Sequence, residues 1–289
     1  MKANYIELKK ERELGEIISD TFLFLRHNYK VLLKLILKIT WPALFFVLVS
    51  FGYYFWSWNG DFFSSYININ SMNNLDFTGF LAVIIMIIAI SVYYALLHGT
   101  VLGAMKSYAE NEGKIMEEAV EWEVRSKFWK LWGGNILVGI LTFFGILLCI
   151  IPGIYLMVPL SLITSVIIFQ NKEVMDSFSE CFQLIKNNWW ITFATILIIG
   201  ILFYIINFVL QLPLTIYVLS KVFVENPDGI VDSDGVMNWI VISLNLLFTL
   251  LQYILFSIIV ISLGFIYFNL NEKKYHTGTF EEIDNLGKH

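Results

Sequence analysis

The chain has 289 residues, of which 57% are hydrophobic, 17% are aromatic and only 15% are charged, with a net charge of −5. A soluble domain carries roughly 25% charged residues, so this composition excludes an ordinary soluble globular protein. The acidic balance also argues against a nucleic-acid partner. Continuous apolar runs separate short charged blocks, and such runs indicate membrane-spanning helices rather than strands.

In the first third of the chain, the pattern of apolar and charged residues predicts one interfacial helix and two membrane spans. Residues 7–30 carry Leu14 and Ile18 at helical spacing between charges, which predicts an amphipathic helix in the membrane interface. A span needs about 20 apolar residues. We therefore expect spans over residues 31–58 and 78–105.

The middle of the chain predicts a second interfacial helix and a hairpin. Residues 114–132 interleave charged and apolar side chains in the same way. The charge-free run that follows is about twice the length of one span, and Pro152 and Gly153 lie near its middle. Because proline breaks a helix and glycine supplies a turn, we expect spans over residues 133–151 and 153–171, joined by a tight turn at the outer face.

The last third repeats this arrangement. Its predicted elements are an interfacial helix over residues 172–188, spans over residues 189–219 and 238–270, and a cytoplasmic tail over residues 271–289. The predicted fold is all-α: a single membrane domain over residues 1–289, with about six transmembrane helices arranged as three hairpins. Each hairpin is preceded by an amphipathic interfacial helix, and the question of true internal symmetry stays open.

Loop charges predict the orientation. In the six-span arrangement, all but one of the 19 Lys and Arg residues lie on the side of the two termini, and only Lys221 lies on the other side. The positive-inside rule then places both termini in the cytoplasm. The membrane would separate Cys149, near the outer end of a span, from Cys181, in a cytoplasmic helix, so no disulfide is expected.

Small residues recur every four positions along the second predicted span. They are Ser91, Ala95, Gly99, Gly103 and Ser107. Such a stripe lets another helix approach closely. We expect helix packing within the same chain, with a homo-oligomer as the alternative.

Mildly polar residues lie inside several predicted spans. They are His98, Asn135, Asn207, Gln211, Asn245 and Gln252. One interpretation is a polar cavity for a lipid headgroup or small solute. The other, which we favour, is hydrogen bonding between helices, worth about 0.6 kcal/mol per contact.

The sequence shows no set of residues typical of catalysis. Apart from Lys34 and Lys38 at the first membrane entry, no charged residue lies inside a predicted span. Catalysis needs positioned acids, bases, nucleophiles or metals, and no metal-ligand spacing occurs. We therefore expect neither an enzyme nor a cofactor.

The predicted cytoplasmic layer holds almost every cation. We expect Arg26, Lys127, Lys130 and Lys186 to lie at the level of the lipid headgroups, where each cation contributes about 1 kcal/mol. The expected function is a non-enzymatic membrane protein that organises lipids or partner proteins at the cytoplasmic interface. An uncoupled carrier or channel for a lipid or small amphiphile is the alternative. The expected partners are membrane lipids, with a protein partner or a homo-oligomer left open.

Short motifs in the second half resemble a known family. They are Ile151-Pro152-Gly153-Ile154-Tyr155, then Glu173 and Ser177, Lys186 with Trp189-Trp190, and Tyr267-Phe268-Asn269-Leu270-Asn271-Glu272-Lys273. They resemble bacterial integral membrane proteins related to the membrane domain of glycerophosphoryl diester phosphodiesterases. These residues include no counterpart of the soluble phosphodiesterase domain that some members carry. The resemblance therefore implies a membrane architecture in a bacterial cytoplasmic membrane, without catalytic residues.

Overall fold

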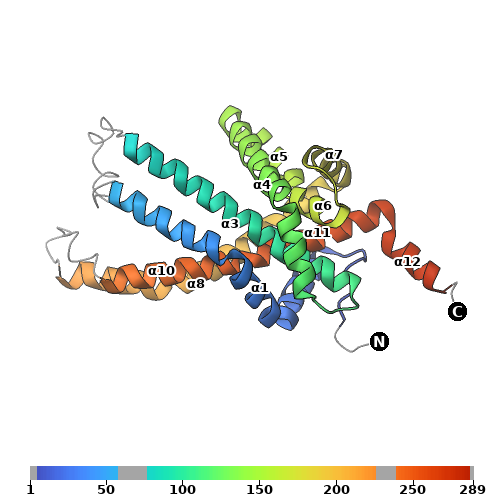
Figure 1. Cartoon of the computed structure of the whole chain (residues 1–289), viewed down its shortest axis with the longest axis horizontal. Coiled ribbons are helices and arrows are strands. Elements are labelled where there is room, and N and C mark those ends of the chain that lie inside the picture. The colour runs from blue at the N-terminus through green and yellow to red at the C-terminus, as the bar shows by residue number, and fades with distance from the viewer. Residues whose placement is uncertain (1–4, 58–76, 226–238, 287–289) are drawn as a thin grey trace.

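The computed structural model describes residues 5–57, 77–225 and 239–286, and every regular element in these ranges is a helix (Figure 1). The helices are α1 (Leu14–Ser57), α3 (Phe77–Glu110), α4 (Glu117–Leu148), α5 (Ile150–Leu160), α6 (Ile163–Gln170), α7 (Val174–Ile185), α8 (Trp189–Glu225), α10 (Trp239–Leu255), α11 (Ser257–Tyr275) and α12 (Thr277–Leu286). Six helical stretches are long and apolar enough to cross a membrane: Leu14–Tyr54, Gly79–Glu110, Glu117–Leu148, Ile150–Gln170, Trp189–Ser220 and Ser243–Tyr275. The predicted all-α polytopic architecture is confirmed. Residue 58, the predicted end of the first span, and residue 238, the predicted start of the last, lie outside the described ranges.

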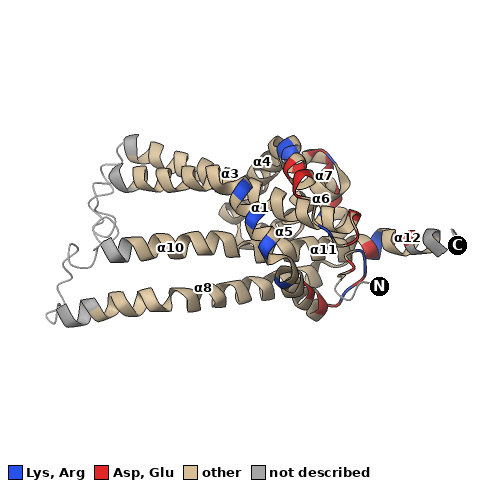
Figure 2. Ribbon diagram, turned by 60° about the horizontal axis from the view of Figure 1, so that its bottom comes forward, with Lys and Arg blue, Asp and Glu red and all other residues tan. Residues whose placement is uncertain are grey.

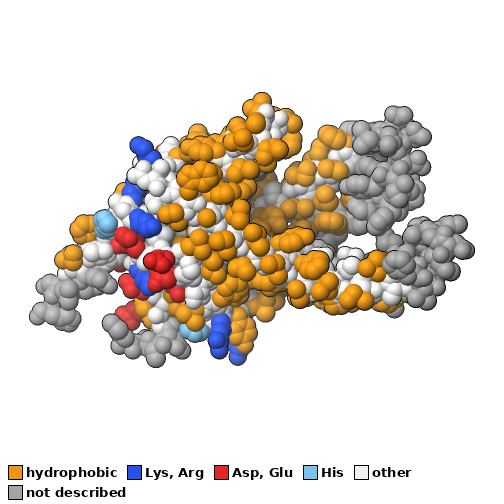
Figure 3. Space-filling model, turned by 180° about the vertical axis from the view of Figure 1, so that it is seen from behind, with side chains coloured by type: hydrophobic (Ala, Val, Ile, Leu, Met, Phe, Trp, Pro, Cys, Tyr) orange, Lys and Arg blue, Asp and Glu red, His pale blue; other side chains and the backbone are white. Residues whose placement is uncertain are grey.

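Helices α1, α3, α8 and α10 extend toward the same end of the molecule (Figure 1). Both termini lie at the opposite end, where the charged residues of the described ranges gather (Figure 2). We call this the charged end; it is built from residues 5–13, α7, α12 and the adjoining ends of α3 and α11. A broad hydrophobic surface separates it from the far end (Figure 3).

Two of the three predicted interfacial helices are not separate elements. Helices α1 and α4 run without a break through residues 30 and 132, where hydropathy divides an interfacial segment from a span. Hydropathy reports the surroundings of a helix, whereas a helix ends only where its hydrogen-bond ladder is interrupted. The third interfacial segment does form a separate helix, α7, which a turn at residues 186–188 divides from α8.

Two predicted spans are interrupted. The segment predicted as a span over residues 153–171 consists of α5 and α6, which meet at Ser161 and Leu162 just after Pro159. The last predicted span is divided into α10 and α11 at Phe256. At the first interruption the Leu162 N–H donates to the Pro159 carbonyl at 3.2 Å, and the Val158 carbonyl accepts from the Ser161 hydroxyl at 2.7 Å.

The hairpin between α4 and α5 turns at Cys149, not at Pro152 and Gly153. Cys149 has an extended backbone, with φ −170° and ψ 140°, and α5 begins at the next residue. Pro152 lies in the first turn of α5, where its missing N–H has no intrahelical acceptor. Gly153 instead lets the two helices touch, because a Cβ there would lie 2.7 Å from the backbone nitrogen of Ile146.

The α4–α5 hairpin leaves the bundle sideways and does not accompany α1 and α3 to the far end (Figure 1). Ile151, at the start of α5, lines a cavity with Lys186 and Trp189, which lie at the start of α8. The turn therefore lies beside the α7–α8 junction, and its location at the outer face of a membrane stays a prediction. Contacts with α7 hold the hairpin there: Lys130 of α4 pairs with Glu173 at 2.5 Å, just before α7 begins.

Helix α11 is the centre of the charged half of the bundle. All but Ile259 of residues 257–270 are buried, and α11 contacts α1, α3, α6, α7 and α8. A Cβ on Gly264 would lie 2.5 Å from the sulfur of Met105. Small residues at such positions permit the close van der Waals packing that holds helices together in lipid.

The small-residue stripe of α3 packs against α4 of the same chain. Cβ positions built on Gly99 and Gly103 lie 2.7 Å from Leu131 and 3.5 Å from Val120, respectively. The ends of the stripe add hydrogen bonds: the Ser91 hydroxyl accepts from the Trp132 indole at 2.9 Å, and the Ser107 hydroxyl accepts from the Met116 N–H at 2.9 Å. Ala95, between them, is fully buried.

Candidate lipid-headgroup site at the charged end

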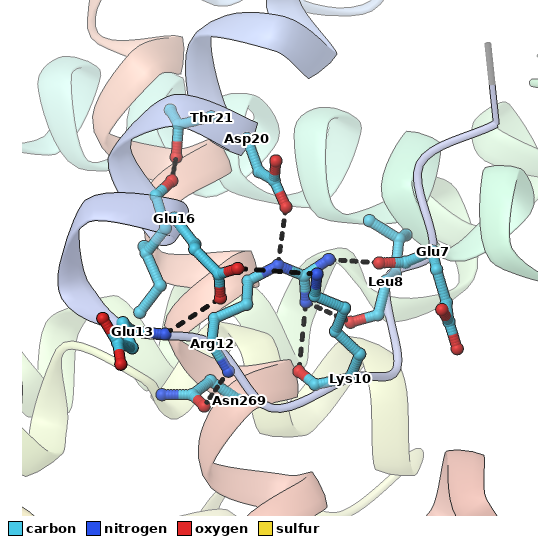
Figure 4. Close-up of polar contacts among 10 residues, drawn as sticks. Glu7, Leu8, Lys10, Arg12, Glu13, Glu16, Asp20, Thr21 and Asn269 are labelled. Atoms are coloured by element: carbon cyan, nitrogen blue, oxygen red, sulfur yellow. Dashed lines mark hydrogen bonds and ion pairs between the residues drawn. The ribbon is translucent and has the colours of Figure 1, made fainter.

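Arg12 ties the N-terminal segment to the helical bundle (Figure 4). Its side chain is fully buried, and Nε donates to Asp20 of α1 at 2.8 Å. The guanidinium also donates to backbone carbonyls of the same segment, including Leu8 at 2.8 Å. The Arg12 N–H donates to Asn269 of α11 at 2.8 Å. A buried guanidinium with this many acceptors is a structural clamp, because burial without partners would be strongly unfavourable.

Glu123 of α4 is the centre of a second buried cluster. Its carboxylate accepts from Lys127 at 2.6 Å and from Lys106 at 2.9 Å. Lys127 also donates to the carbonyls of Ile167 and Ile168 at 3.3 and 3.2 Å. These carbonyls belong to the last turn of α6, where unpaired acceptors and the helix dipole favour a cation. The cluster joins α3, α4 and α6.

Glu180 of α7 anchors that helix to the end of α11. Its carboxylate accepts from Lys172 at 2.7 Å and from the Tyr275 hydroxyl at 2.7 Å, with Lys274 at 3.3 Å. Burial raises the pKa of the Glu180 carboxyl, but the hydrogen bonds from Lys172 and Tyr275 and the nearby ammonium charges outweigh it, so the net pKa is lowered. The neighbouring Cys181 thiol has a pKa that burial raises, and its neutral form packs in the core.

The lowered pKa of Glu180 predicts acid-labile stability. A carboxyl whose pKa is lower in the folded state stabilises the fold above its unfolded pKa, and that contribution is lost as the pH falls through the folded pKa. The melting temperature of Glu180→Gln in detergent should therefore lie below that of the wild type at neutral pH, and the difference should shrink as the pH drops below about 4. Glu173→Gln, which removes a largely exposed carboxylate nearby, is the control. A difference that stays constant down to low pH would contradict this prediction.

Glu272 holds helix α12 in place. Its carboxylate accepts from the N–H groups of Gly278 and Thr279 at 2.8 and 3.0 Å and from the Thr279 hydroxyl at 2.9 Å. These amides belong to the first turn of α12, where a carboxylate is favoured. Gly278 also meets the Lys9 carbonyl so closely that a Cβ would lie 2.2 Å from it.

The junction between α7 and α8 differs from these clusters because its cation is exposed. Lys186 lies in the turn, and no ion pair joins it to another described residue. Trp189 follows, and its indole donates to the Tyr155 carbonyl of α5 at 3.3 Å while its ring stacks on Tyr155 with centroids 5.6 Å apart. Trp190 is 76% exposed. The sequence thus brings an exposed cation and an aromatic cluster from two helices to one place.

Two cavities meet at Lys186. The first, of about 540 Å³, is lined by Ile151, Ile154, Tyr155, Lys186, Asn187, Trp189, Trp190 and Phe193. The second, of about 370 Å³, is lined by Gln183, Leu184, Lys186, Asn187, Asn188, Leu270, Lys273 and Lys274. One is aromatic and apolar, and the other is rich in ammonium and amide groups. Together they form the candidate headgroup site.

Of the four cations predicted to contact headgroups, Arg26 and Lys186 have the exposure that this role needs. Lys130, by contrast, is paired with Glu173. Lys127 is only 8% exposed, and the prediction for it is wrong. Its partners Glu123 and the α6 carbonyls draw it into the protein, because a buried ammonium needs such neighbours.

Four of the residues predicted for a polar cavity bond to their own helix or are exposed. Asn207 donates to the Phe203 carbonyl of its own helix at 2.8 Å, whereas Gln211, Asn245 and Gln252 are exposed. None of these four residues lines either of the two cavities at Lys186.

His98 and Asn135 lie near each other without a formed hydrogen bond. Both ring nitrogens of His98 and the amide nitrogen of Asn135 are buried without a hydrogen-bond partner among the described residues. Tyr94 and Phe256 surround the imidazole, with ring centroids 6.5 and 6.2 Å away. The surroundings of the imidazole are therefore aromatic.

Lys273 and Lys274 belong to the site, although the sequence predicts them in the cytoplasmic tail. Helix α11 extends to Tyr275 and carries both to the α7–α8 junction. The helical spacing of Tyr267, Leu270 and Lys274 was the available signal. Among the described residues, no three His, Cys, Asp or Glu side chains gather in a way that would hold a metal ion.

The fold and the site define an all-α polytopic protein with an ion-paired layer at one end and an exposed aromatic and basic junction within it. Comparisons with protein-family models, curated proteins and solved structures found no match. The resemblance to the phosphodiesterase membrane-domain family therefore stays a prediction.

Proposed function

We propose that this protein binds anionic lipid headgroups at the cytoplasmic face of a membrane, with the charged end on the cytoplasmic side, and that it acts without catalysis. The observation that carries the proposal is the position of Lys186 between an aromatic cavity and a basic cavity. The excess of Lys and Arg on one side of the predicted topology supports placing the charged end on the cytoplasmic side.

A phospholipid fits the chemistry of these two cavities. The phosphate of the headgroup would lie beside Lys186 and Lys273, where each cation contributes about 1 kcal/mol. The glycerol and upper acyl chains would lie against Tyr155, Trp189 and Trp190. Tryptophan and tyrosine favour this depth, because they present an apolar ring and a polar tip.

The packing of the bundle supports binding over transport. A carrier would need a polar path between the two ends, whereas Asn207 bonds to its own helix and Gln211 and Gln252 are exposed. The core around α11 is apolar and closely packed at Gly264. We therefore prefer a lipid-organising protein to an uncoupled carrier.

Neutralising Lys186 and Lys273 together should weaken the binding of anionic lipid. Two lost cations correspond to about 2 kcal/mol, which is on the order of a 30-fold increase in Kd. The measurement is the rise in melting temperature of detergent-solubilised protein titrated with phosphatidylglycerol or with phosphatidylcholine. We expect the double variant Lys186→Gln/Lys273→Gln to lose the response specific to phosphatidylglycerol.

The matched control removes the same charge elsewhere at the charged end. Lys30→Gln/Lys114→Gln neutralises two exposed cations that line neither cavity. This variant should keep the phosphatidylglycerol response. Equal losses in both double variants would show a diffuse charge effect and overturn the proposed site.

A further inference from the structure

We propose that the α4–α5 hairpin is a re-entrant element that inserts into the leaflet at the charged end and does not cross the membrane. The chain would then cross four times, through α1, α3, α8 and the α10–α11 segment. The partner of the hairpin is the hydrocarbon of that single leaflet. This inference concerns how the chain lies in a bilayer and does not depend on the headgroup proposal.

The tip of the hairpin lies at the level where α8 begins. Ile151, two residues after the turn, shares a cavity with Lys186 and Trp189. One turn further along α5, the Tyr155 carbonyl accepts from the Trp189 indole at 3.3 Å. Helix α8 runs 37 residues onward from Trp189, which at about 1.5 Å per residue exceeds a bilayer. A hairpin that crossed beside α8 would carry its tip to the other end of α8.

Helix α7 fixes the direction of the hairpin. It is amphipathic, with Cys181 and Leu184 buried and Asp176 and Gln183 exposed, which is typical of a helix in the interface plane. Its first residue, Val174, faces Gly133 at the base of the hairpin. The residue after its end, Lys186, faces the hairpin tip. The hairpin therefore runs alongside an in-plane helix from base to tip.

The surface of the tip matches hydrocarbon rather than water. Six large apolar side chains there are 53% to 84% exposed: Phe143, Phe144, Leu147, Leu148, Ile150 and Ile151. The sequence contains no Asp, Glu, Lys or Arg between Lys130 and Lys172. Exposed apolar patches of this kind mark membrane or protein contacts. The adjacent Lys186 and Trp189, which are typical of the headgroup level, favour the membrane as the partner.

Cys149 is a native probe of this arrangement. It is exposed at the turn itself, whereas Cys181, the only other cysteine, is buried. Cys181→Ala leaves Cys149 as the single thiol, in full-length protein reconstituted into sealed vesicles of phosphatidylcholine and phosphatidylglycerol. Ser179→Cys on α7 and Ser220→Cys near the end of α8, each in a Cys149→Ala/Cys181→Ala background, report the charged and far sides. These references identify the sides without assuming which one is cytoplasmic.

Two readouts decide the inference. A membrane-impermeant maleimide added on the Ser220→Cys side should not react with Cys149. A fluorophore attached to Cys149 should lose more fluorescence to a nitroxide near the top of the acyl chain than to one near the bilayer centre. Reaction from the Ser220→Cys side, or stronger quenching by the central nitroxide, would show that the hairpin crosses or reaches deeper, and would overturn the inference. Quenching by neither nitroxide would show that protein, such as a second copy, covers the tip, and would overturn it equally.

Discussion

Replacing Glu123 with glutamine should lower the free energy of unfolding by roughly 3–5 kcal/mol. Lys127 is almost fully buried, and Glu123 supplies its carboxylate partner at 2.6 Å. The variant leaves Lys127 with only the two carbonyls of α6, and it also removes the partner of Lys106. A buried charge without its counterion is far less favourable than the same charge in water. Thermal unfolding in detergent, followed by circular dichroism, measures the loss.

Two further variants separate charge burial from a general loss of acidity. Glu121→Gln on the same helix removes the partner of Lys38, whose side chain is 54% exposed, and should have little effect because exposed pairs contribute little. Glu123→Gln combined with Lys127→Met should recover most of the lost stability, because it removes the buried ammonium that Glu123→Gln alone leaves without a counterion. If Glu123→Gln alone were as stable as Glu121→Gln, the structural role of the Glu123 cluster would be contradicted.

The long helices were predictable because their signal is local. Apolar runs longer than one bilayer width set the approximate positions of α3 and α8, and the structure begins α8 at the predicted Trp189. The continuity of α1 and α4 was not predictable from hydropathy. Nothing in either sequence stops the helix where the apolar run begins, since neither Lys30 nor Trp132 breaks a helix.

The position of the hairpin turn shows where local signals fail. Pro152 and Gly153 look like a turn, yet proline is equally suited to the first turn of a helix. Gly153 serves a contact between helices, and that contact depends on Ile146 of the facing helix. The sideways direction of the hairpin depends on α7 and α8, which follow later in the chain. No local pattern carries that information.

Two of the buried ion pairs have a signal in the sequence that indicates pairing within the protein. Glu123 and Lys127 are four residues apart on one helix, the spacing of a helical ion pair, which indicated a partner for Lys127 within the protein. Glu180 lies on the apolar face of α7, three residues after Ser177 and next to Cys181, and a carboxylate there predicts a buried, paired group. Arg12 had no such signal, because its acceptors are Asp20 and local carbonyls in a non-helical segment.

Replacing Gly153 with alanine should destabilise the α4–α5 hairpin. The added Cβ would lie 2.5 Å from a side-chain carbon of Ile146, 2.7 Å from its backbone nitrogen and 2.9 Å from its Cα. Side chains can rotate away, but the backbone of α4 cannot move without separating the helices. Overpacking of this kind costs about 1–3 kcal/mol, and occasionally more, and a backbone contact favours the upper part of that range.

Gly139→Ala is the matched control, because it adds the same methyl group to α4 at a position with no neighbouring atom within 4 Å. Alanine is favoured over glycine in a helix by about 1 kcal/mol, so this variant should unfold at or above the wild-type temperature. The two variants therefore shift the melting temperature in detergent in opposite directions. Gly145, opposite Gly153, provides a second test, since a Cβ there would lie 2.9 Å from the Gly153 Cα and should be similarly unfavourable. Equal stability of Gly153→Ala and Gly139→Ala would mean that α4 and α5 do not pack closely at this crossing, and the sideways hairpin would lose its main internal contact.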